Sequence, residues 1–395
     1  MIRPRFACGL IARTLKMKAR EKPSFTFGIE EEYFLVDPRT RALVSEPPKS
    51  VLDECKAELG GHVSAEYQRS QIEVATRICT HASEAREHLG HLRKGVTGIA
   101  SRHGLATMAA STHPFTRWRT QRHTDKQRYK AIADDLKGVG RRMVIGGMHV
   151  HVGIDDGDQR IAVMSEMRPY LPLLLALSAS SPFWQGENTG LKSYRTAIND
   201  ATPRSGMPES FASWSDYQRT VGTLVRSDVI QDATKIWWDL RPSARFPTLE
   251  LRITDVCPLI EDALCIAALF RCLCRSLWRR NKKGRRSPNY PLLVLNENRW
   301  RAQRYGLEQG FIDLHGESIK TSAALVDDLL DLIGEDADDL SSNADIAHAR
   351  TILARGTSAD RQLALYRLQL DRGVTRPRAL RMIVDQLIAE TVDGI

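Results

Sequence analysis

The sequence predicts an α+β fold, and two observations carry this prediction. Segments that alternate apolar and polar residues, as β-strands do, are separated by long connections with helical spacing instead of a regular strand–helix series. The composition, with 42% hydrophobic and 27% charged residues, is that of a globular protein and excludes a disordered, collagen-like or coiled-coil chain. We expect one domain over residues 23–395, in which the region 318–395 is helical.

Each predicted element has its own local signal. The predicted strands are 25–37, 70–78, 142–155 and 248–256. The predicted helices are 83–104, 159–178, 214–231 and 260–278. In the first of these helices Leu89, Leu92, Val96 and Ile99 recur at helical spacing, and Ser83 is placed to cap the N-terminus.

The net charge of +9 is concentrated at the N-terminus. Residues 1–22 hold seven Lys and Arg residues against Glu21 alone, which leaves the rest of the chain only mildly basic. A uniformly basic nucleic-acid-binding protein is therefore a poor description. We expect residues 1–22 to be a disordered extension, or the true start to be Met17, with the residues before it read from an upstream start codon. A targeting or membrane-surface arm is the alternative.

Two further charged runs are interpreted as solvent-exposed. RRNKKGRR at 279–286 is predicted to be a basic loop, and this is favoured over a nucleic-acid patch. The acidic run between Asp327 and Asp339 is predicted to be a solvated helix face.

The cysteine pattern suits a reducing compartment. Seven cysteines are present without a CxxC pair, and Cys265 and Cys272 are interpreted as small core residues. No uncharged apolar run is long enough to span a membrane. We therefore expect a cytoplasmic protein without membrane or nucleic-acid partners.

The predicted strands each have one apolar face and one face rich in acids, His or Arg. Alternation puts Glu31 with the apolar residues of its strand. The polar faces carry Glu30, Glu32, Glu73, His149, His151, Glu250 and Arg252. An exposed antiparallel sheet gives such alternation by itself, but it does not explain why carboxylates predominate. If the strands adjoin, the repulsion between carboxylates must be offset by protons or cations.

This set of residues favours a hard divalent cation such as Mg²⁺ or Mn²⁺ over Zn²⁺, because carboxylates dominate and no Cys contributes. Arg252 shares its strand face with Glu250, and Arg241 and Arg245 lie just before that strand. These arginines are suited to clamp phosphate or carboxylate groups, including a polyphosphate held beside the cation. The sequence contains no GxxxxGK[ST], GxGxxG or Gx[SC]xG element.

Seven motifs then occur in a recognisable order: FGIEEEYFLVD, SQIEVAT, THPF, GMHVHVG, WWDLRPS, LELRITDV and NRWRAQRYGLE. Their order and distances closely resemble the type-2 glutamate–cysteine ligase family, a family of carboxylate–amine ligases related to glutamine synthetase. The resemblance runs from about Phe25 to the C-terminus. It implies a glutamine-synthetase-like fold, in which a curved antiparallel sheet lined with metal ligands is backed by outer helices.

The resemblance also implies residue roles and a reaction. The metal ligands it implies are Glu30, Glu32, Glu73, His149 and Glu250. Arg252 and Arg241 are implied as the catalytic arginines that face the ATP phosphate and an acyl phosphate. His151, His113 and Arg195 are implied to lie in the substrate pocket. The implied reaction is ATP- and Mg²⁺-dependent amide formation, either from L-glutamate and L-cysteine or from another acid and amine.

The stretch TAINDATPRSGMPES, which follows the SYR motif, departs from the family pattern and leaves the acid and the amine open. Two other functions are weighed: a phosphotransferase on the same fold, and a nucleic-acid- or membrane-surface-binding protein. The second leaves the acidic strand faces unexplained. We expect small-molecule amino acid and amine substrates, and a homodimer is the oligomeric state that the family suggests.

Overall fold

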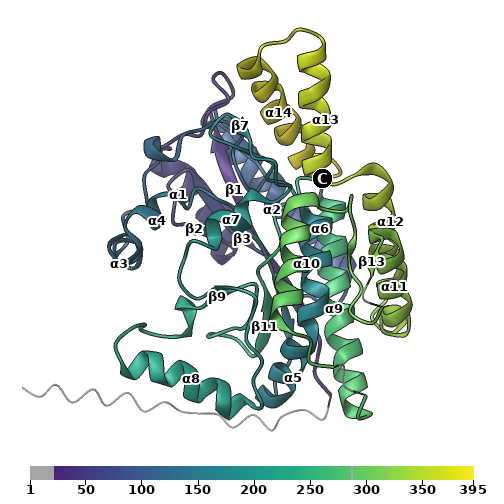
Figure 1. Ribbon diagram of the computed structural model, residues 1–395. Coiled ribbons are helices and arrows are strands. Elements are labelled where there is room, and N and C mark those ends of the chain that lie inside the picture. Colours follow the sequence, from purple (N-terminus) through teal and green to yellow (C-terminus); the bar gives the residue numbers. More distant parts are fainter. Residues whose placement is uncertain (1–21, 286–287, 317) are drawn as a thin grey trace, which may run out of the picture.

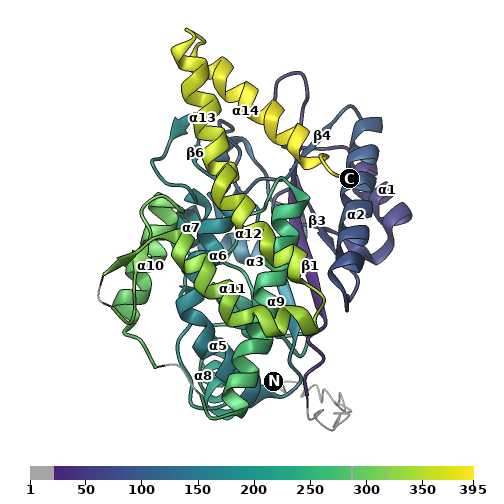
Figure 2. The ribbon, with the colours of Figure 1, turned by 90° about the vertical axis from the view of Figure 1, so that its right-hand side faces the viewer.

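The computed structural model describes residues 22–285, 288–316 and 318–395. Almost all of the expected N-terminal extension therefore lies outside the described residues, as does Arg286 of the basic run. Within the described part, helices pack against a central sheet (Figures 1 and 2).

Most strands belong to the central sheet, and the rest form short two-stranded ladders. The central strands are β1 (Phe27–Val36), β2 (Val63–Ala65), β3 (Gln71–Ala75), β4 (Ala106–Met108), β5 (Met148–Gly153), β10 (Leu240–Pro242) and β11 (Thr248–Leu251). The ladders pair β6 (Phe183–Trp184) with β7 (Glu187–Asn188), β8 (Ser205–Gly206) with β9 (Trp237–Trp238), and β12 (Phe311–Ile312) with β13 (Ile319–Lys320).

The helices are distributed along the whole chain. They are α1 (Lys49–Leu59), α2 (Ala82–Arg102), α3 (Gln127–Leu136), α4 (Gly138–Arg141), α5 (Gly157–Met167), α6 (Leu171–Ser178), α7 (Tyr194–Asn199), α8 (Trp214–Arg226), α9 (Ile260–Lys282), α10 (Leu292–Tyr305), α11 (Ser322–Asp339), α12 (Asn343–Arg355), α13 (Ser358–Asp371) and α14 (Arg376–Thr391). From Ser322 onward the elements are the four helices α11 to α14.

The central sheet is antiparallel, with strand order β10-β11-β5-β1-β3-β2, and β4 pairs with the far end of β1. All four predicted strands belong to it. Because β1 is central, its side chains meet those of β3 on one side and β5 on the other.

The apolar face of the sheet packs against helices. Ile29 of β1 and Val150 of β5 are completely buried, as is most of α9. Figure 1 shows α11 and α12 on one side of the molecule and α3 and α4 on the other. The polar face of the sheet is left open toward α3. Among the described residues, no helix is long and apolar enough to cross a bilayer.

Helix α9 is the centre of the core. It begins with two acids, Glu261 and Asp262, and ends with basic residues, an order that complements the helix dipole. Cys265 and Cys272 are fully buried, which confirms them as core residues. The six cysteines in the described part of the chain are all buried and free.

A buried ion pair holds β1 to α2. Arg93 of α2 donates from Nε and Nη2 to the two carboxylate oxygens of Glu31, at 2.9 and 2.7 Å. The hydroxyl of Tyr33 also donates to Glu31, and Arg93 reaches the carbonyl of Cys257. Glu31 therefore points away from the acidic face, as its place in the alternation predicts.

The helix predicted over 159–178 is instead two helices, α5 and α6, joined by a 3₁₀ turn over Arg168–Tyr170. The reason is the pair Pro169 and Pro172, which lack the N–H groups that a continuous helix needs.

Two other segments also differ from their predictions. The strand over 142–155 shortens to β5, and of the two glycines that precede it Gly147 makes only an isolated bridge, with Asp255. The basic run at 279–286 is not simply a loop, since α9 continues through Lys282 and Arg279 pairs with Asp336.

The acidic run on α11 is only partly a solvated face. Asp336 is completely buried, and its carboxylate accepts hydrogen bonds from Arg275 and Arg279 of α9. The sequence prediction was wrong for this residue because the arginines that neutralise it lie on a helix distant in the sequence.

Replacing Arg93 with Met should destabilise the fold by about 3–5 kcal/mol, because it leaves the Glu31 charge buried without its partner. Arg102→Met is the matched control on the same helix; it removes an exposed pair with Glu58 and should cost less than about 1 kcal/mol. Urea unfolding followed by circular dichroism measures both. Equal losses for the two variants would contradict the importance of the buried pair.

Candidate active site

The register of the central sheet brings the predicted site residues together. Glu32 of β1 lies directly opposite Glu73 of β3. Glu30 of β1 lies opposite His149 of β5. His151 lies opposite Glu250 of β11, and Glu250 lies opposite Arg241 of β10. Five adjacent strands therefore contribute to one polar surface.

This surface forms the floor of a cavity of about 480 Å³. All the site residues predicted from the sequence, except His113, line it. Further lining comes from Lys126, Arg128 and Tyr129 at the start of α3, and from the 243–247 loop. One half of the cavity is acidic and the other is rich in arginine.

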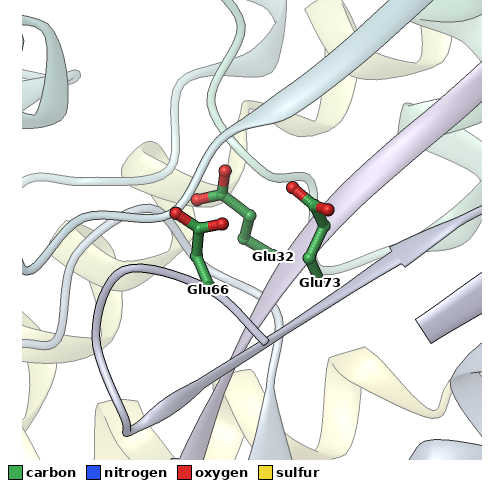
Figure 3. Close-up of side chains that lie close together, drawn as sticks. All are labelled: Glu32, Glu66 and Glu73. Carbon is green, nitrogen blue, oxygen red and sulfur yellow. The ribbon is translucent and has the colours of Figure 1, made fainter. Parts of the chain in front are cut away.

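The acidic half is formed by Glu32, Glu66 and Glu73. One carboxylate oxygen from each lies within 4.8 Å of the others, and the three side chains project to the same side of the strands (Figure 3). Glu66 was missed by the sequence analysis. It follows the three-residue strand β2, in a turn that gives no periodic signal.

Burial and mutual repulsion make these carboxylates hard to ionise. Burial, and after it the charges of Glu66 and Glu73, raises the pKa of Glu32 well above its usual range. Burial is also the main cause that raises the pKa of Glu66. The pKa of Glu73 rises to about 8, from burial and the charges of Glu66 and Glu30. Three oxygen donors that repel one another fit a hard divalent cation such as Mg²⁺ or Mn²⁺.

Glu30 stands between two imidazoles. Its carboxylate oxygens lie 3.4 Å from Nδ1 of His149 and 3.4 Å from Nε2 of His151. Burial alone would raise the pKa of Glu30, but the two neighbouring histidines lower it. Burial and the nearby Arg252 charge lower the pKa of His149 to about 4, so this imidazole is neutral at physiological pH.

In the arginine-rich half, Glu250 is held by two guanidinium groups. Arg241 donates to both of its oxygens, at 2.9 and 3.1 Å, and Arg252 donates to one of them. Although burial would raise the pKa of Glu250, these two charges lower it far below its usual range. Its predicted role as a metal ligand does not fit this geometry, because both oxygens are already paired with arginines.

Arg195 of α7 approaches the same arginines from the side. Its Nη1 and Nη2 donate to the carbonyls of Ile253 and Arg252, and its buried Nε has no partner among the described residues. Gly147 makes room for it: a Cβ at that position would lie 2.5 Å from Nη2 of Arg195. The Gly147 N–H donates to Glu32 at 2.9 Å, which links the two halves of the cavity.

His113 is not brought to the cavity. Its Nδ1 accepts from the backbone N–H groups of Phe115 and Thr116, and its Nε2 lies 2.8 Å from the carbonyl of Arg41. Burial lowers the pKa of His113 to about 3. This geometry is that of a neutral imidazole that supports a turn, and it does not support the predicted contact with substrate.

Comparison with known proteins identifies the family. The family model "Glutamate-cysteine ligase family 2" matches residues 26–383. The chain belongs to this family. The relative "Putative glutamate--cysteine ligase 2" from Rhodospirillum rubrum is 51% identical over 375 residues, which are 94% of this chain and 96% of that relative. The protein of the same name from Ruegeria pomeroyi is 48% identical and covers 93% of this chain and 95% of its own length.

Solved structures show the same fold at low sequence identity. A glutamate–cysteine ligase from Francisella tularensis, crystallised with AMP, matches with a TM-score of 0.68 and 12% identity, over 95% of this chain and 90% of that one. A bifunctional glutathione synthetase from Pasteurella multocida matches with a TM-score of 0.67 and 15% identity, over 93% of this chain and 53% of that one. The predicted glutamine-synthetase-like α+β fold is confirmed. Membership of glutamate–cysteine ligase family 2 also confirms the predicted enzyme class, an ATP-dependent carbon–nitrogen ligase.

The raised pKa of Glu73 predicts that stability falls as the pH rises. The folded protein holds a proton on Glu73 up to a pH of about 8, whereas the unfolded chain releases it near the ordinary value of 4.5. The stability gained from this proton is fully present below the unfolded pKa and is lost as the pH rises through the folded pKa. Without metal, thermal stability should therefore fall between about pH 4.5 and about pH 8, and Mg²⁺ should restore it.

Thermal melts of wild type and Glu73→Gln with and without Mg²⁺ test this prediction. In Glu73→Gln, thermal stability should fall less with rising pH than in wild type, and Mg²⁺ should stabilise the variant less. Glu58→Gln, an exposed change elsewhere on the surface, should behave like wild type. A metal-free stability that rises over this pH range would contradict the prediction.

Proposed function

We propose that this protein is an ATP- and Mg²⁺-dependent ligase that activates a carboxylic acid as an acyl phosphate and transfers the acyl group to an amine. The observation that carries this proposal is the division of one cavity into a carboxylate group and a facing set of arginines. The first suits a divalent cation and the second suits phosphate and carboxylate anions.

In this proposal Glu32, Glu66 and Glu73 hold a divalent cation, with Glu30 and His149 beside them. Mg²⁺ there would offset the negative charge that two anionic reactants bring together. Carboxylate oxygens from three separate segments favour Mg²⁺ or Mn²⁺ over softer metals.

The arginines act on the transferred phosphoryl group. A carboxylate oxygen of the acid attacks the γ-phosphorus of ATP, the bond to the bridging oxygen breaks, and ADP leaves. The amine then attacks the acyl carbon, phosphate leaves, and the amine loses a proton to form the amide. Glu250 fixes the planes of Arg241 and Arg252, so that the N–H groups left without a partner, most of them on Arg252, meet developing charge without reorganisation.

The substrates are proposed from chemistry and family together. The names of the relatives favour L-glutamate and L-cysteine, joined as γ-glutamylcysteine. Lys126, Arg128 and Arg245 at the rim of the cavity would attract an acid that keeps a second carboxylate. The stretch over 196–210, which runs from α7 through β8, departs from the pattern of the family that the sequence resembles, so another acid or amine stays an alternative. We also retain a cytoplasmic homodimer, which light scattering of the purified protein tests.

Release of ADP from Mg²⁺·ATP, screened with amino acids singly and in pairs, is the direct test. One acid with one amine should stimulate release, and hydroxylamine should trap the acyl phosphate as a hydroxamate with the acid alone. A stable phosphorylated product without amide would instead indicate the phosphotransferase. If no pair stimulates release and calorimetry finds no binding of Mg²⁺·ATP, the proposal fails.

Glu66→Gln should lower kcat/KM by at least about 100-fold, equivalent to about 2.7 kcal/mol of transition-state stabilisation, because it removes one of three cation-binding carboxylates. Raising the Mg²⁺ concentration should recover part of the loss. Glu58→Gln again serves as the matched control. Wild-type activity in Glu66→Gln would exclude Glu66 from the metal site.

A further inference from the structure

Arg299 of α10 lies outside the cavity and joins two segments that supply its arginines. It belongs to the NRWRAQRYGLE motif, to which the sequence analysis assigned no role. Its guanidinium donates from Nε and Nη2 to Asp239, at 2.6 and 3.1 Å. The same guanidinium donates from Nη1 and Nη2 to Asp200, at 2.7 Å each. Arg299 thus makes two bidentate contacts at once.

The contact with Asp239 connects Arg299 to the segments that carry Arg241 and Arg252. Asp239 lies two residues before Arg241, in the bend between β9 and β10. Its carbonyl accepts the backbone N–H groups of Arg252 at 2.8 Å and Ile253 at 3.0 Å. Its own N–H donates to Gly206. Any shift of Asp239 therefore moves the backbone that carries both arginines.

The contact with Asp200 connects Arg299 to the helix that carries Arg195. Asp200 ends the short helix α7, which carries Arg195, and its neighbour Asn199 lines the cavity. Arg195 in turn donates to the carbonyl of Arg252 at 2.9 Å. Through Asp239 and Asp200, Arg299 is therefore connected to the arginine-rich half of the cavity along two separate segments of the chain.

We propose that Arg299 is a positioning residue. It fixes the position of Arg195 relative to Arg241 and Arg252, because it binds Asp200 at the end of α7 and Asp239 before β10 at the same time. The inference rests on the proposed function, because it assumes that these arginines face the phosphoryl group. Only arginine has the planar, five-donor group that satisfies two carboxylates in this way, since the ammonium of lysine is a point donor. Arg299 itself is 7% exposed, and its two carboxylate partners, Asp239 and Asp200, do not line the cavity.

Arg299→Lys is the central variant, because it keeps the buried positive charge and removes the bidentate geometry. Displacing catalytic groups by about 1 Å can cost about 100-fold in rate. We expect kcat to fall at least about tenfold while KM for ATP changes by less than about threefold, because the loss arises in the transition state. Asp200→Asn weakens only the contact between Arg299 and α7. It should therefore lower kcat less than Arg299→Lys does, again with little change in KM for ATP.

The matched control is Arg301→Lys, two residues along α10. Arg301 donates to the carbonyls of Gly310 and Gln309, away from the cavity, and its replacement should leave kcat unchanged. Binding of Mg²⁺·ADP with aluminium fluoride, a mimic of the transferred phosphoryl group, provides a readout without turnover. Arg299→Lys should weaken binding of this mimic about tenfold and leave binding of Mg²⁺·ADP alone unchanged.

Unchanged kcat and unchanged binding of the mimic in folded Arg299→Lys would overturn the inference. So would a loss of activity that only follows the fraction of folded protein in thermal melts, in both Arg299→Lys and Asp200→Asn. Failure of the proposed function looks different, because the wild type itself would then show neither ADP release nor binding of Mg²⁺ nucleotide.

Discussion

The alternation of side chains along β1 is the constraint on which the site depends. Glu30 and Glu32 reach the cavity only because Glu31, between them, is taken by Arg93 on the helix side. A slip of one residue would exchange these faces, so that two carboxylates would enter the core and Arg93 would be left buried without a partner. The ion pair in the core therefore specifies the register of the polar surface opposite to it.

The cavity is electrostatically divided before any ligand enters. Glu32, Glu66 and Glu73 disfavour one another's charge, whereas Glu250 stabilises the positive charge of Arg252 beside it. Under the proposed function, a bound cation would reduce the repulsion among these three carboxylates, and a bound anion would meet donors already oriented by Glu250. Such preorganisation is worth most where water is excluded, because the protein dipoles need not rearrange during the reaction.

Alternation was sufficient to predict the four strands, their polar faces and the opposite orientation of Glu31. It was insufficient where a residue lies in a turn, which is why Glu66 was missed. It also could not show which partner a side chain selects: Glu250 pairs with arginines from its own and the next strand, and Asp336 is neutralised from α9. His113 lies within a family motif, but motif order carries no information on which way a ring points.

The placement of the cysteines has a consequence for handling thiols. None of the six described cysteines lines the cavity, and burial raises the pKa of Cys55 to about 11 and that of Cys272 to about 12. Buried thiols that resist ionisation react slowly with disulfides. A thiol-bearing amine could therefore occupy the cavity without forming a mixed disulfide with its walls. Consumption of such a substrate could also be followed with a chromogenic disulfide reagent, with little background from these six residues in the folded protein.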